Sequence, residues 1–512
     1  MEKIKVGDVL VGKLSSSVNG GGYFSNTELD KDIYIYKANT NKALHLDTVK
    51  VELIQVKNRI EGKVVEVVER FKTEYVGTMQ VDDKHAFFKP DSSKITTDFF
   101  VPTKHRMSVK HGQKVVVDMY NWKGKLPNAK VIKILGDAGE HHTEMHSIME
   151  EYGLPYVFPN DVIEEAEEIN DTITQEEIDK RRDLRHVTIV GIDPYDSRDA
   201  DDTIGLEWEN GIATVSINIA DVSHYVKQGS LLDREAYARG NSVYLVDRCV
   251  PMLPERLSNQ ICSLKSGSDK LCYSAIFKMD KKGQIIERWF GKTIINVDRD
   301  YSYEEAQEVI ENGVREEHKA TDQVIIELNR LAKTLRKERL NDEFLQIDSP
   351  EVKFKLDENN KPIEIVFKLS KDSNKLIEEY MLLANKEVAK YVKSRGLLCI
   401  NRVHQAPDIG KLMALKEFVK QFDYELKLSD EDEIRSSINK LLEDTKDTPE
   451  GDIISKLVTR TQQKAIYSSK NLGHYGLNFN DYSHFTSPIR RYSDLILHRI
   501  LTVALGNDGY NK

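Results

Sequence analysis

The sequence predicts a multidomain protein in which two small β-barrels precede one large α/β (α+β) domain. Three observations support this fold class. The first quarter of the chain repeats itself, its repeats are built from short strand-like segments, and the rest combines buried strands with long amphipathic helices. With 512 residues, the chain is long enough for several domains with substantial cores.

Composition and charge exclude several classes of protein. Hydrophobic residues make up 39% and charged residues 31%, which excludes a disordered or collagen-like chain. The formal charge of −10 excludes a uniformly basic nucleic-acid-binding protein, so a polyanion would need a local basic groove. The four cysteines are scattered without a CxxC pair, and no signal core or apolar run of membrane length is present. We therefore expect reduced thiols and a cytoplasmic location.

Residues 1–70 and 71–137 are predicted to form the two barrels. Strand-like blocks of the first segment return in the second at offsets of 64 to 67 residues, for example Tyr23-Phe24 as Phe87-Phe88 and Lys63 as Lys130. Such a constant offset indicates an internal duplication. Each copy combines β-branched and aromatic segments with Gly-containing turns, which is the pattern of an OB-type, cold-shock-like barrel.

Aromatic side chains recur in the strands of both copies. In an OB-type barrel, exposed aromatic rings on adjacent strands stack on nucleic-acid bases, and we expect at least two of them to do so. The alternative is that they belong to the barrel cores, although strand alternation turns only about half of them inward. The candidates are Tyr23, Phe24, Tyr34, Phe87 and Phe88.

The composition changes between residues 138 and 180. Pro155 and Pro159 interrupt a segment rich in Glu and Ile, which predicts a linker with short acidic helices.

Residues 181–512 are predicted to form the large domain. A buried strand is expected at residues 187–190, and Asn210-Gly211 is a strong signal for a type I′ hairpin. Apolar residues at helical spacing predict helices over residues 321–339 and 374–395.

An aspartate cluster lies between the predicted strand and the hairpin. The segment Gly191–Asp202 contains five carboxylates, and like charges at this density raise each other's pKa unless a cation neutralises them. Hard oxygen ligands in a short loop suit Mg²⁺ or Mn²⁺, and the spacing does not fit an EF-hand. The alternative is a solvated acidic turn. The apolar flanks and the stiffening Pro194 favour an anchored loop instead.

A second cluster runs from His484 to Arg499. We expect Thr486 or Ser487 to cap a helix with a proline in its first turn. A helix N-terminus beside Arg490 and Arg491 would form a phosphate-binding site. Together with a metal-binding carboxylate loop, this arrangement suggests phosphoryl chemistry.

These motifs resemble, in the same order, those of the ribonuclease II / ribonuclease R family. The matching segments are Gly191–Asp202, Ile219–Val226, Arg239–Tyr244, Pro251–Pro254 and His484–Arg499. The segment Glu144–Pro159 fits the ribonuclease R branch better. The resemblance implies a processive, hydrolytic 3′→5′ exoribonuclease that releases nucleoside 5′-monophosphates. Its partner would be single-stranded RNA with the 3′ end in a catalytic channel; we expect a monomer without membrane association.

The resemblance also implies roles for individual residues. By motif position, the aspartates would hold Mg²⁺ (or Mn²⁺) and activate water, with Asp201 and Arg490 as catalytic residues. Tyr244 would stack on the 3′-terminal base, Glu378 or Glu379 would support the 3′ end, and Arg491 would contact RNA. The four proposed metal ligands are Asp193, Asp199, Asp201 and Asp202.

The chain departs from the family pattern in three places, one of which is Asn401, where the family usually has an aromatic residue. Family members usually carry another OB-type RNA-binding domain after the catalytic one, and this chain is expected to lack it. Glu343 and Ile347 stand where the family has a glycine and an aromatic residue, so one side of the base clamp is expected to differ.

Two alternative functions compete with the exonuclease. One is a catalytically silent RNA-binding protein on the same scaffold, which the carboxylates disfavour because they would face a polyanion. The other is a metal-dependent phosphatase acting on small molecules, which does not explain the duplicated barrels.

Overall fold

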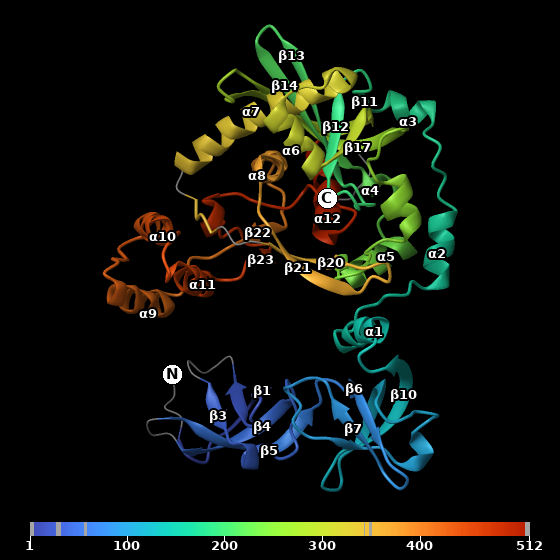
Figure 1. Ribbon diagram of the computed structural model, residues 1–512, viewed down its shortest axis with the longest axis vertical. Helices are drawn as coiled ribbons and strands as arrows, with labels where there is room; N and C mark the ends of the chain where they lie inside the picture. Colours follow the sequence, from blue (N-terminus) through green and yellow to red (C-terminus); the bar gives the residue numbers. More distant parts are fainter. Residues whose placement is uncertain (1–4, 27–31, 56–58, 342–343, 348–350, 507–512) are drawn as a thin grey trace. The chain divides into compact units, whose positions relative to one another are not determined.

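The computed structural model describes residues 5–26, 32–55, 59–341, 344–347 and 351–506. The chain forms two compact units, Met1–Tyr156 and Val157–Lys512 (Figure 1). Each unit has its own hydrophobic clusters and is described by itself.

Two closed five-stranded barrels make up the first unit, as the sequence repeat predicts. The strands follow the order β1-β2-β3-β5-β4 in the first barrel and β10-β8-β7-β6-β9 in the second. The first barrel comprises β1 (Val9–Ser16), β2 (Gly22–Ser25), β3 (Ile33–Ile35), η1 (Lys37–Asn39), β4 (Thr48–Gln55) and β5 (Glu61–Glu69). The second comprises β6 (Glu74–Val81), β7 (Ala86–Pro90), β8 (Phe99–Phe100), η2 (Thr103–His105), β9 (Gln113–Asn121) and β10 (Asn128–Asp137), followed by α1 (His141–Glu151).

Strand alternation decides which aromatic residues face each barrel core. Phe24 and Phe88 are fully buried, whereas Tyr23 is 45% exposed and Tyr34 and Phe87 are half-buried. The expectation that Phe24 and Phe88 contact RNA is therefore wrong, because a ring inside the core offers no face to a base.

The second unit is built on one mixed sheet. Its strand order is β11-β18-β17-β14-β13-β12-β19, and the neighbours are antiparallel except β11 with β18 and β12 with β19. The strands are β11 (Arg182–Asp183), β12 (Ile189–Asp193), β13 (Asp202–Glu209), β14 (Ile212–Ala220), β17 (Asp269–Met279), β18 (Ile285–Asn296) and β19 (Arg299–Ser302). Asn210 and Gly211 have φ angles of 51° and 81°, as the type I′ turn between β13 and β14 requires.

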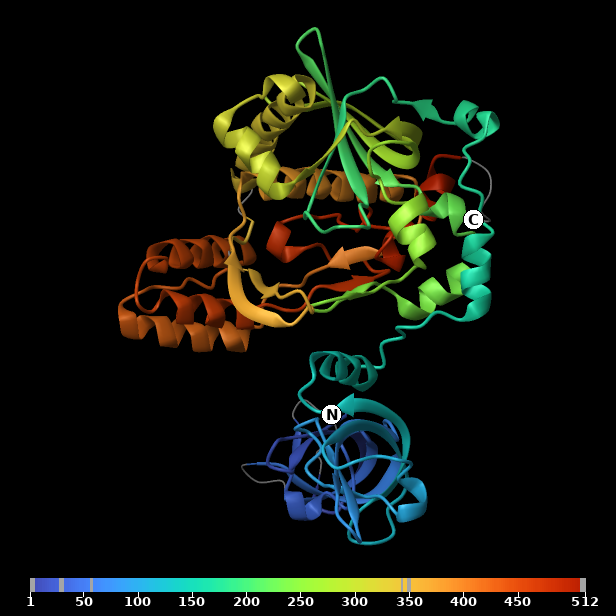
Figure 2. The same ribbon diagram turned by 45° about the vertical axis from the view of Figure 1, so that its right-hand side comes forward.

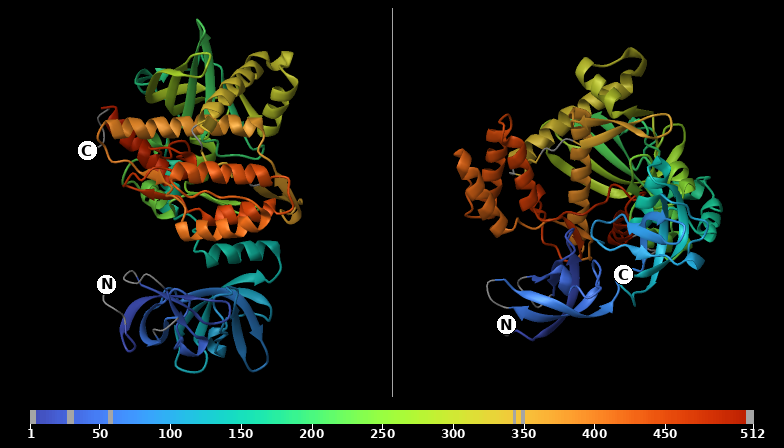
Figure 3. Two further views of the ribbon diagram at one scale, coloured as in Figure 1. Left: turned by 90° about the vertical axis from the view of Figure 1, so that its left-hand side faces the viewer. Right: turned by 60° about the horizontal axis from the view of Figure 1, so that its bottom comes forward.

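Helices cover both faces of this sheet. Alternate residues of β17 enter opposite cores, with Tyr273 and Phe277 on one face and Cys272 and Ile276 on the other. The first face packs against α6 (Tyr303–Asn312), α7 (Lys319–Asn341), α8 (Asp372–Ser394) and α12 (Tyr492–Ala504). The second packs against α2 (Asn160–Glu167), α4 (Val222–Tyr225), α5 (Leu231–Arg239) and the π-helix η3 (Arg256–Ile261). The long helix α8 is the upper orange helix in the left panel of Figure 3.

A helical subdomain with its own core is inserted between β22 and β23. It contains α9 (Ile409–Val419), η5 (Lys420–Phe422), α10 (Glu431–Thr445) and α11 (Gly451–Thr461), the orange-red group in Figure 2. The remaining elements are α3 (Gln175–Asp179), β15 (Val243–Tyr244), β16 (Cys249–Val250), η4 (Glu316–His318), β20 (Glu351–Leu356), β21 (Pro362–Lys368), β22 (Asn401–Val403), β23 (Ile466–Ser468) and η6 (Tyr475–Leu477). Within the ranges that the structure describes, no helix is both long and apolar enough to span a membrane.

Candidate active site

A cavity of about 480 Å³ lies where the end of β12, the start of β13, α8 and the segment before α12 meet. It brings together most of the residues that the sequence singled out. The predicted residues that line it are Asp193, Asp199, Asp201, Asp202, Tyr244, Glu378, Arg490 and Arg491.

The sheet itself positions the aspartates. Asp193 is the last residue of β12 and Asp202 the first of β13, and these neighbouring strands are antiparallel, so the loop between them must turn back over the sheet edge. Ser263 anchors this loop. Its hydroxyl accepts a hydrogen bond from the Ala200 N–H at 3.2 Å and donates one to the Arg198 carbonyl at 2.8 Å. The aspartate segment is thus a structural loop and not a solvated acidic turn.

Burial and mutual repulsion raise the pKa values of three of these carboxyl groups. Loss of hydration raises the pKa of Asp193 to about 6 and that of Asp201 to about 7. The pKa of Asp202 is raised by burial and then by Asp193 and Asp201. Such a group of carboxylates favours a nearby cation, because positive charge lowers the cost of ionising them together.

Arg490 provides one positive charge in the cavity. Its Nε donates to Oδ2 of Asp201 at 3.1 Å, and its Nη2 donates to the Ser487 hydroxyl at 2.9 Å. The Ile489 backbone N–H donates to the other oxygen of Asp201 at 2.8 Å. These hydrogen bonds hold the Arg490 guanidinium in place, and only its Nε binds Asp201.

The expected helix start at Thr486 or Ser487 is wrong. The helix α12 begins at Tyr492, and a turn closed by the Arg491 N–H and the Ser487 carbonyl precedes it. The N–H of Ser487 already donates to the buried Asp494 carboxylate at 2.9 Å. Asp201 and Asp494 thus accept hydrogen bonds from the N–H groups of Ile489 and Ser487, which a free helix terminus would offer to a phosphate. The groups that remain available to an anion are the arginine side chains.

Tyr244 lies opposite this turn, on β15. Its hydroxyl donates to Oδ2 of Asp199 at 2.7 Å, and the residue is 54% exposed. Burial of the hydroxyl and the Asp199 carboxylate raise the pKa of Tyr244, so the phenol stays protonated. The exposed ring can stack on a base while the hydroxyl orients Asp199.

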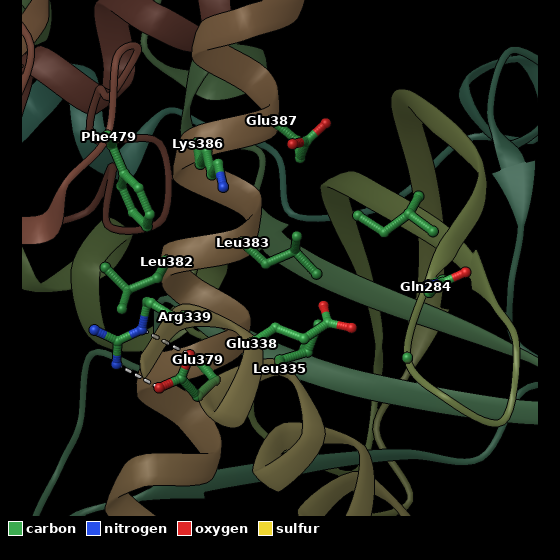
Figure 4. A pocket seen from close by; sticks show the side chains of 12 residues that line it. Gln284, Leu335, Glu338, Arg339, Glu379, Leu382, Leu383, Lys386, Glu387 and Phe479 are labelled. Carbon is green, nitrogen blue, oxygen red and sulfur yellow. Dashed lines mark hydrogen bonds and ion pairs between the residues drawn. The ribbon is translucent and has the colours of Figure 1, made fainter. Parts of the chain in front are cut away.

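Helix α8 separates the two candidate glutamates. Glu378 lines the aspartate cavity, whereas Glu379 is buried in a different cavity and forms an ion pair with Arg339, as Figure 4 shows. Adjacent positions on a helix point about 100° apart, which is why only one of the two reaches the site. The expectation that Glu379 supports the RNA end is therefore corrected in favour of Glu378.

Two further residues organise the site. The Asn385 side chain accepts a hydrogen bond from the Phe485 N–H at 2.7 Å and so joins α8 to the segment before α12. Asp494 is fully buried and also accepts from Arg491 Nη2 at 2.7 Å. Sequence reasoning assigned no role to Asp494, although its position three residues after Arg491 is a signal for a helical ion pair.

The other predicted residues lie elsewhere. Tyr23, Tyr34 and Phe87 belong to the first unit. Glu343 lies outside the described residues, and Ile347 packs against the core of the helical subdomain.

Oxygen donors dominate the site and fit a hard cation. Within the described ranges, however, no group of three or more His, Cys, Asp or Glu side chains is arranged so that it could hold a metal ion as it stands. Mg²⁺ is often bound through only one or two carboxylates together with water and substrate phosphate. The chemistry of the donors therefore suits Mg²⁺ or Mn²⁺.

Comparisons with known proteins agree with this architecture. Residues 181–507 match the RNB domain, residues 87–159 a cold shock domain and residues 12–67 the ribonuclease B OB domain. Ribonuclease R of Thermotoga maritima is 37% identical over 98% of this chain and 72% of its own length.

Solved structures show the same fold. Mycoplasma genitalium RNase R, in complex with ribose-methylated single-stranded RNA, superposes with a TM-score of 0.90 at 26% identity, over 96% of this chain and 79% of that one. Yeast Ssd1, a pseudonuclease, has a TM-score of 0.73 at 21% identity, over 98% of this chain and 70% of its own. Because a pseudonuclease shares the fold, the fold alone does not decide activity, and the side chains of the site must.

Proposed function

This chain belongs to the ribonuclease II / ribonuclease R family, and on that basis we propose that it is a processive, hydrolytic 3′→5′ exoribonuclease releasing nucleoside 5′-monophosphates. One observation carries the proposal. Four aspartates, Arg490 and the exposed ring of Tyr244 line one cavity. This set combines cation-binding oxygens, a phosphate-binding guanidinium and a stacking surface, which are the groups that hydrolysis of a terminal phosphodiester requires.

Different side chains of the site bind different groups at the 3′ end of the RNA. Tyr244 stacks on the 3′-terminal base, and the Glu378 carboxylate accepts hydrogen bonds from the terminal ribose hydroxyls. Arg490 offers its outer N–H groups to the scissile phosphate, because its Nε is occupied by Asp201. Arg491, held by Asp494, adds positive charge for the backbone.

Asp193, Asp199, Asp201 and Asp202 would hold Mg²⁺, with Mn²⁺ as a substitute. When bound, the ion would acidify a water molecule and polarise a phosphate oxygen. The raised pKa values of Asp193, Asp201 and Asp202 support this assignment, since a cation offsets their mutual repulsion.

The barrels of the first unit would bind single-stranded RNA upstream of the cleaved end. Tyr23 exposes its ring on β2, and Tyr34 and Phe87 lie partly exposed on neighbouring or equivalent strands. Because the chain carries a net charge of −10, these contacts would be local, and stacking would contribute more than general attraction.

The proposal includes a monomeric enzyme in the cytoplasm. All four cysteines are unbonded thiols, as expected in a reducing compartment.

Digestion of labelled oligonucleotides tests the activity. Single-stranded RNA labelled at its 5′ end should shorten one nucleotide at a time with Mg²⁺ present, and EDTA should stop the reaction. Chromatography of the products should show nucleoside 5′-monophosphates. Binding without shortening would support the rival function, a catalytically silent RNA-binding protein, and internal cleavage would contradict both.

A further inference from the structure

Arg339 lies at the C-terminal end of α7 and is only 7% exposed. Its Nε donates to Oε2 of Glu379 at 3.2 Å, and its Nη2 donates to Oε1 of the same carboxylate. Figure 4 shows this two-point contact between α7 and α8. The bidentate geometry fixes the plane of the guanidinium, which a single contact would not do.

The same guanidinium reaches a second carboxylate. Its Nη2 lies 3.6 Å from Oε1 of Glu378, whose side chain is 50% exposed and lines the aspartate cavity. Arg339 is thus the cation that stands between the buried Glu379 and the glutamate facing the site.

A third contact fixes the arginine from the other side. The guanidinium carbon lies 3.9 Å from the ring centre of Phe344. The Phe344 carbonyl accepts from the Asn439 amide at 2.8 Å, and the Leu345 N–H donates to the Gly476 carbonyl at 2.9 Å. Arg339 is therefore held by α8 and by a segment that is itself tied to α10 and η6.

Glu378 needs such a partner. A half-exposed glutamate has several accessible rotamers, and ordering it costs conformational entropy. Four aspartates line the same cavity, so their negative charge repels the Glu378 carboxylate from the site. A fixed guanidinium at 3.6 Å opposes both effects, because it attracts the carboxylate to one position and offsets part of the repulsion.

We propose that Arg339 is a positioning residue that orders the Glu378 carboxylate toward the terminal ribose of the RNA. The inference rests on the proposed function, because it assigns Arg339 a role only through Glu378. Arg339 itself touches no substrate; it acts by determining where the acceptor of the ribose hydroxyls lies.

A test must separate this role from the structural one. Removing Arg339 alone leaves the buried Glu379 carboxylate with only the longer, 3.9 Å contact to Arg336, which destabilises the fold whatever the role of Glu378. The double variant Arg339→Gln/Glu379→Gln removes both charges of the buried pair. Its matched control, Glu379→Gln, keeps Arg339 beside Glu378. A second control is Arg336→Gln, because Arg336 lies 3.9 Å from Glu379 in the structure.

The experiment measures the single-turnover rate at which the terminal nucleotide is released from two RNAs. One RNA ends in a ribonucleotide and the other in a 2′-deoxynucleotide, and the two are otherwise identical. The ratio of the two rates reports the contact between Glu378 and the ribose, which a general loss of stability would not change. We expect Glu378→Gln and the double variant to slow the reaction of the ribose-terminated RNA roughly tenfold. The ratio of the ribose-terminated rate to the deoxy-terminated rate should therefore fall to the same value in both variants. Arg336→Gln should retain the parent ratio. Glu379→Gln should give a ratio between those of the parent and the double variant, because Arg339 keeps its charge beside Glu378 but loses its bidentate partner.

A triple variant, which combines Glu378→Gln with the double variant, completes a mutant cycle. No further loss is expected, because both changes remove the same contact. An additional tenfold loss, or equal slowing of both RNAs in the double variant, would overturn the role of Arg339 while leaving the exonuclease intact. An unchanged ratio in Glu378→Gln would overturn the roles of both residues, and absence of nucleotide release from the parent protein would overturn the proposed function itself.

If the double variant does not fold, as judged by its thermal unfolding midpoint, Arg339→Lys serves as the second test. A lysine keeps the charge but cannot bind Glu379 bidentately and reach Glu378 from the same plane. The ratio should fall between those of the parent and Glu378→Gln, and a parent-like ratio would count against the proposal.

Discussion

Arg490 and Asp201, which are 289 residues apart in the chain, form a hydrogen-bonded ion pair at 3.1 Å inside the candidate active site. Asp201 is 4% exposed and also accepts the Ile489 N–H. The pair joins the aspartate loop to the turn before α12, so the two motifs identified separately in the sequence come together in one site.

Asp201→Asn should abolish RNA cleavage while RNA binding is retained. The amide keeps the shape and can still accept from Ile489, but it removes one of the charges that would hold the metal. We expect a loss of about a thousandfold or more in the single-turnover rate. Asp196→Asn is the control, because Asp196 is exposed in the same loop. A variant that keeps over about a tenth of the parent rate would contradict the metal assignment.

Arg490→Lys should also be a poor enzyme. A lysine cannot bind Asp201 through one N–H and present further N–H groups to phosphate from the same plane. We expect a fall of about a hundredfold in kcat, measured with saturating RNA. Arg288→Lys is the control and should behave as the parent does, because Arg288 is half-exposed and pairs with Glu387 outside the site. Near-normal turnover of Arg490→Lys would remove this residue from the catalytic machinery.

Tyr244→Ala should lengthen the shortest RNA product. Stacking contributes about 1–3 kcal/mol per base, so short RNAs that no longer reach the barrels should dissociate earlier. Tyr244→Phe keeps the ring and loses only the hydrogen bond to Asp199. It should therefore retain the parent product length on a sequencing gel. Equal product lengths for Ala and Phe variants would show that the ring does not hold the RNA.

Tyr23 and Phe24 offer a matched pair in the first barrel. Tyr23→Ala should weaken RNA binding without affecting thermal stability, because its ring is 45% exposed. Phe24→Ala should destabilise the barrel by about 3–5 kcal/mol, because its ring fills the core. Fluorescence anisotropy with labelled RNA and denaturant unfolding of the full chain distinguish the two effects. Unchanged affinity in Tyr23→Ala would exclude base stacking at this position.

His474 should make stability depend on pH. Burial, with a contribution from His404, lowers the pKa of His474 to about 4, whereas the unfolded value is about 6.5. At a pH between these two values, His474 binds a proton in the unfolded chain but not in the folded one. The free energy of unfolding should therefore fall as the pH drops from about 6.5 to 4, by at most about 1.4 kcal/mol per unit.

His474→Asn should reduce this slope, since asparagine can still accept the Leu477 N–H but does not titrate. Denaturant unfolding at several pH values measures the effect, and His186→Asn is the exposed control. Identical slopes for the parent and His474→Asn would show that the pKa of His474 is not lowered in the folded state.

Features that depend on local patterns could be predicted from the sequence alone. The offset between the two repeats predicted two barrels, and Asn210-Gly211 predicted the hairpin between β13 and β14. Helical spacing predicted α7 and α8 to within a few residues of their observed bounds. In each case the signal and the structure lie within one stretch of chain, so neighbouring side chains suffice to specify the result.

Which side chains face the site depends on how distant segments pack in the folded chain. Alternation showed that about half of the barrel aromatics are buried but left open which half, and the register placed Phe24 inside and Tyr23 outside. Helical geometry placed Glu378 and Glu379 on different sides of α8, and the neighbouring α7 determined that Glu379 pairs with Arg339. The helix α12 starts at Tyr492 and not at Thr486 or Ser487, and in the segment before it Asp201 and Asp494 accept hydrogen bonds from the N–H groups of Ile489 and Ser487. Asp201 is 288 residues from Ile489, so only the folded chain brings this acceptor to the segment, whereas the local sequence shows the capping preference alone.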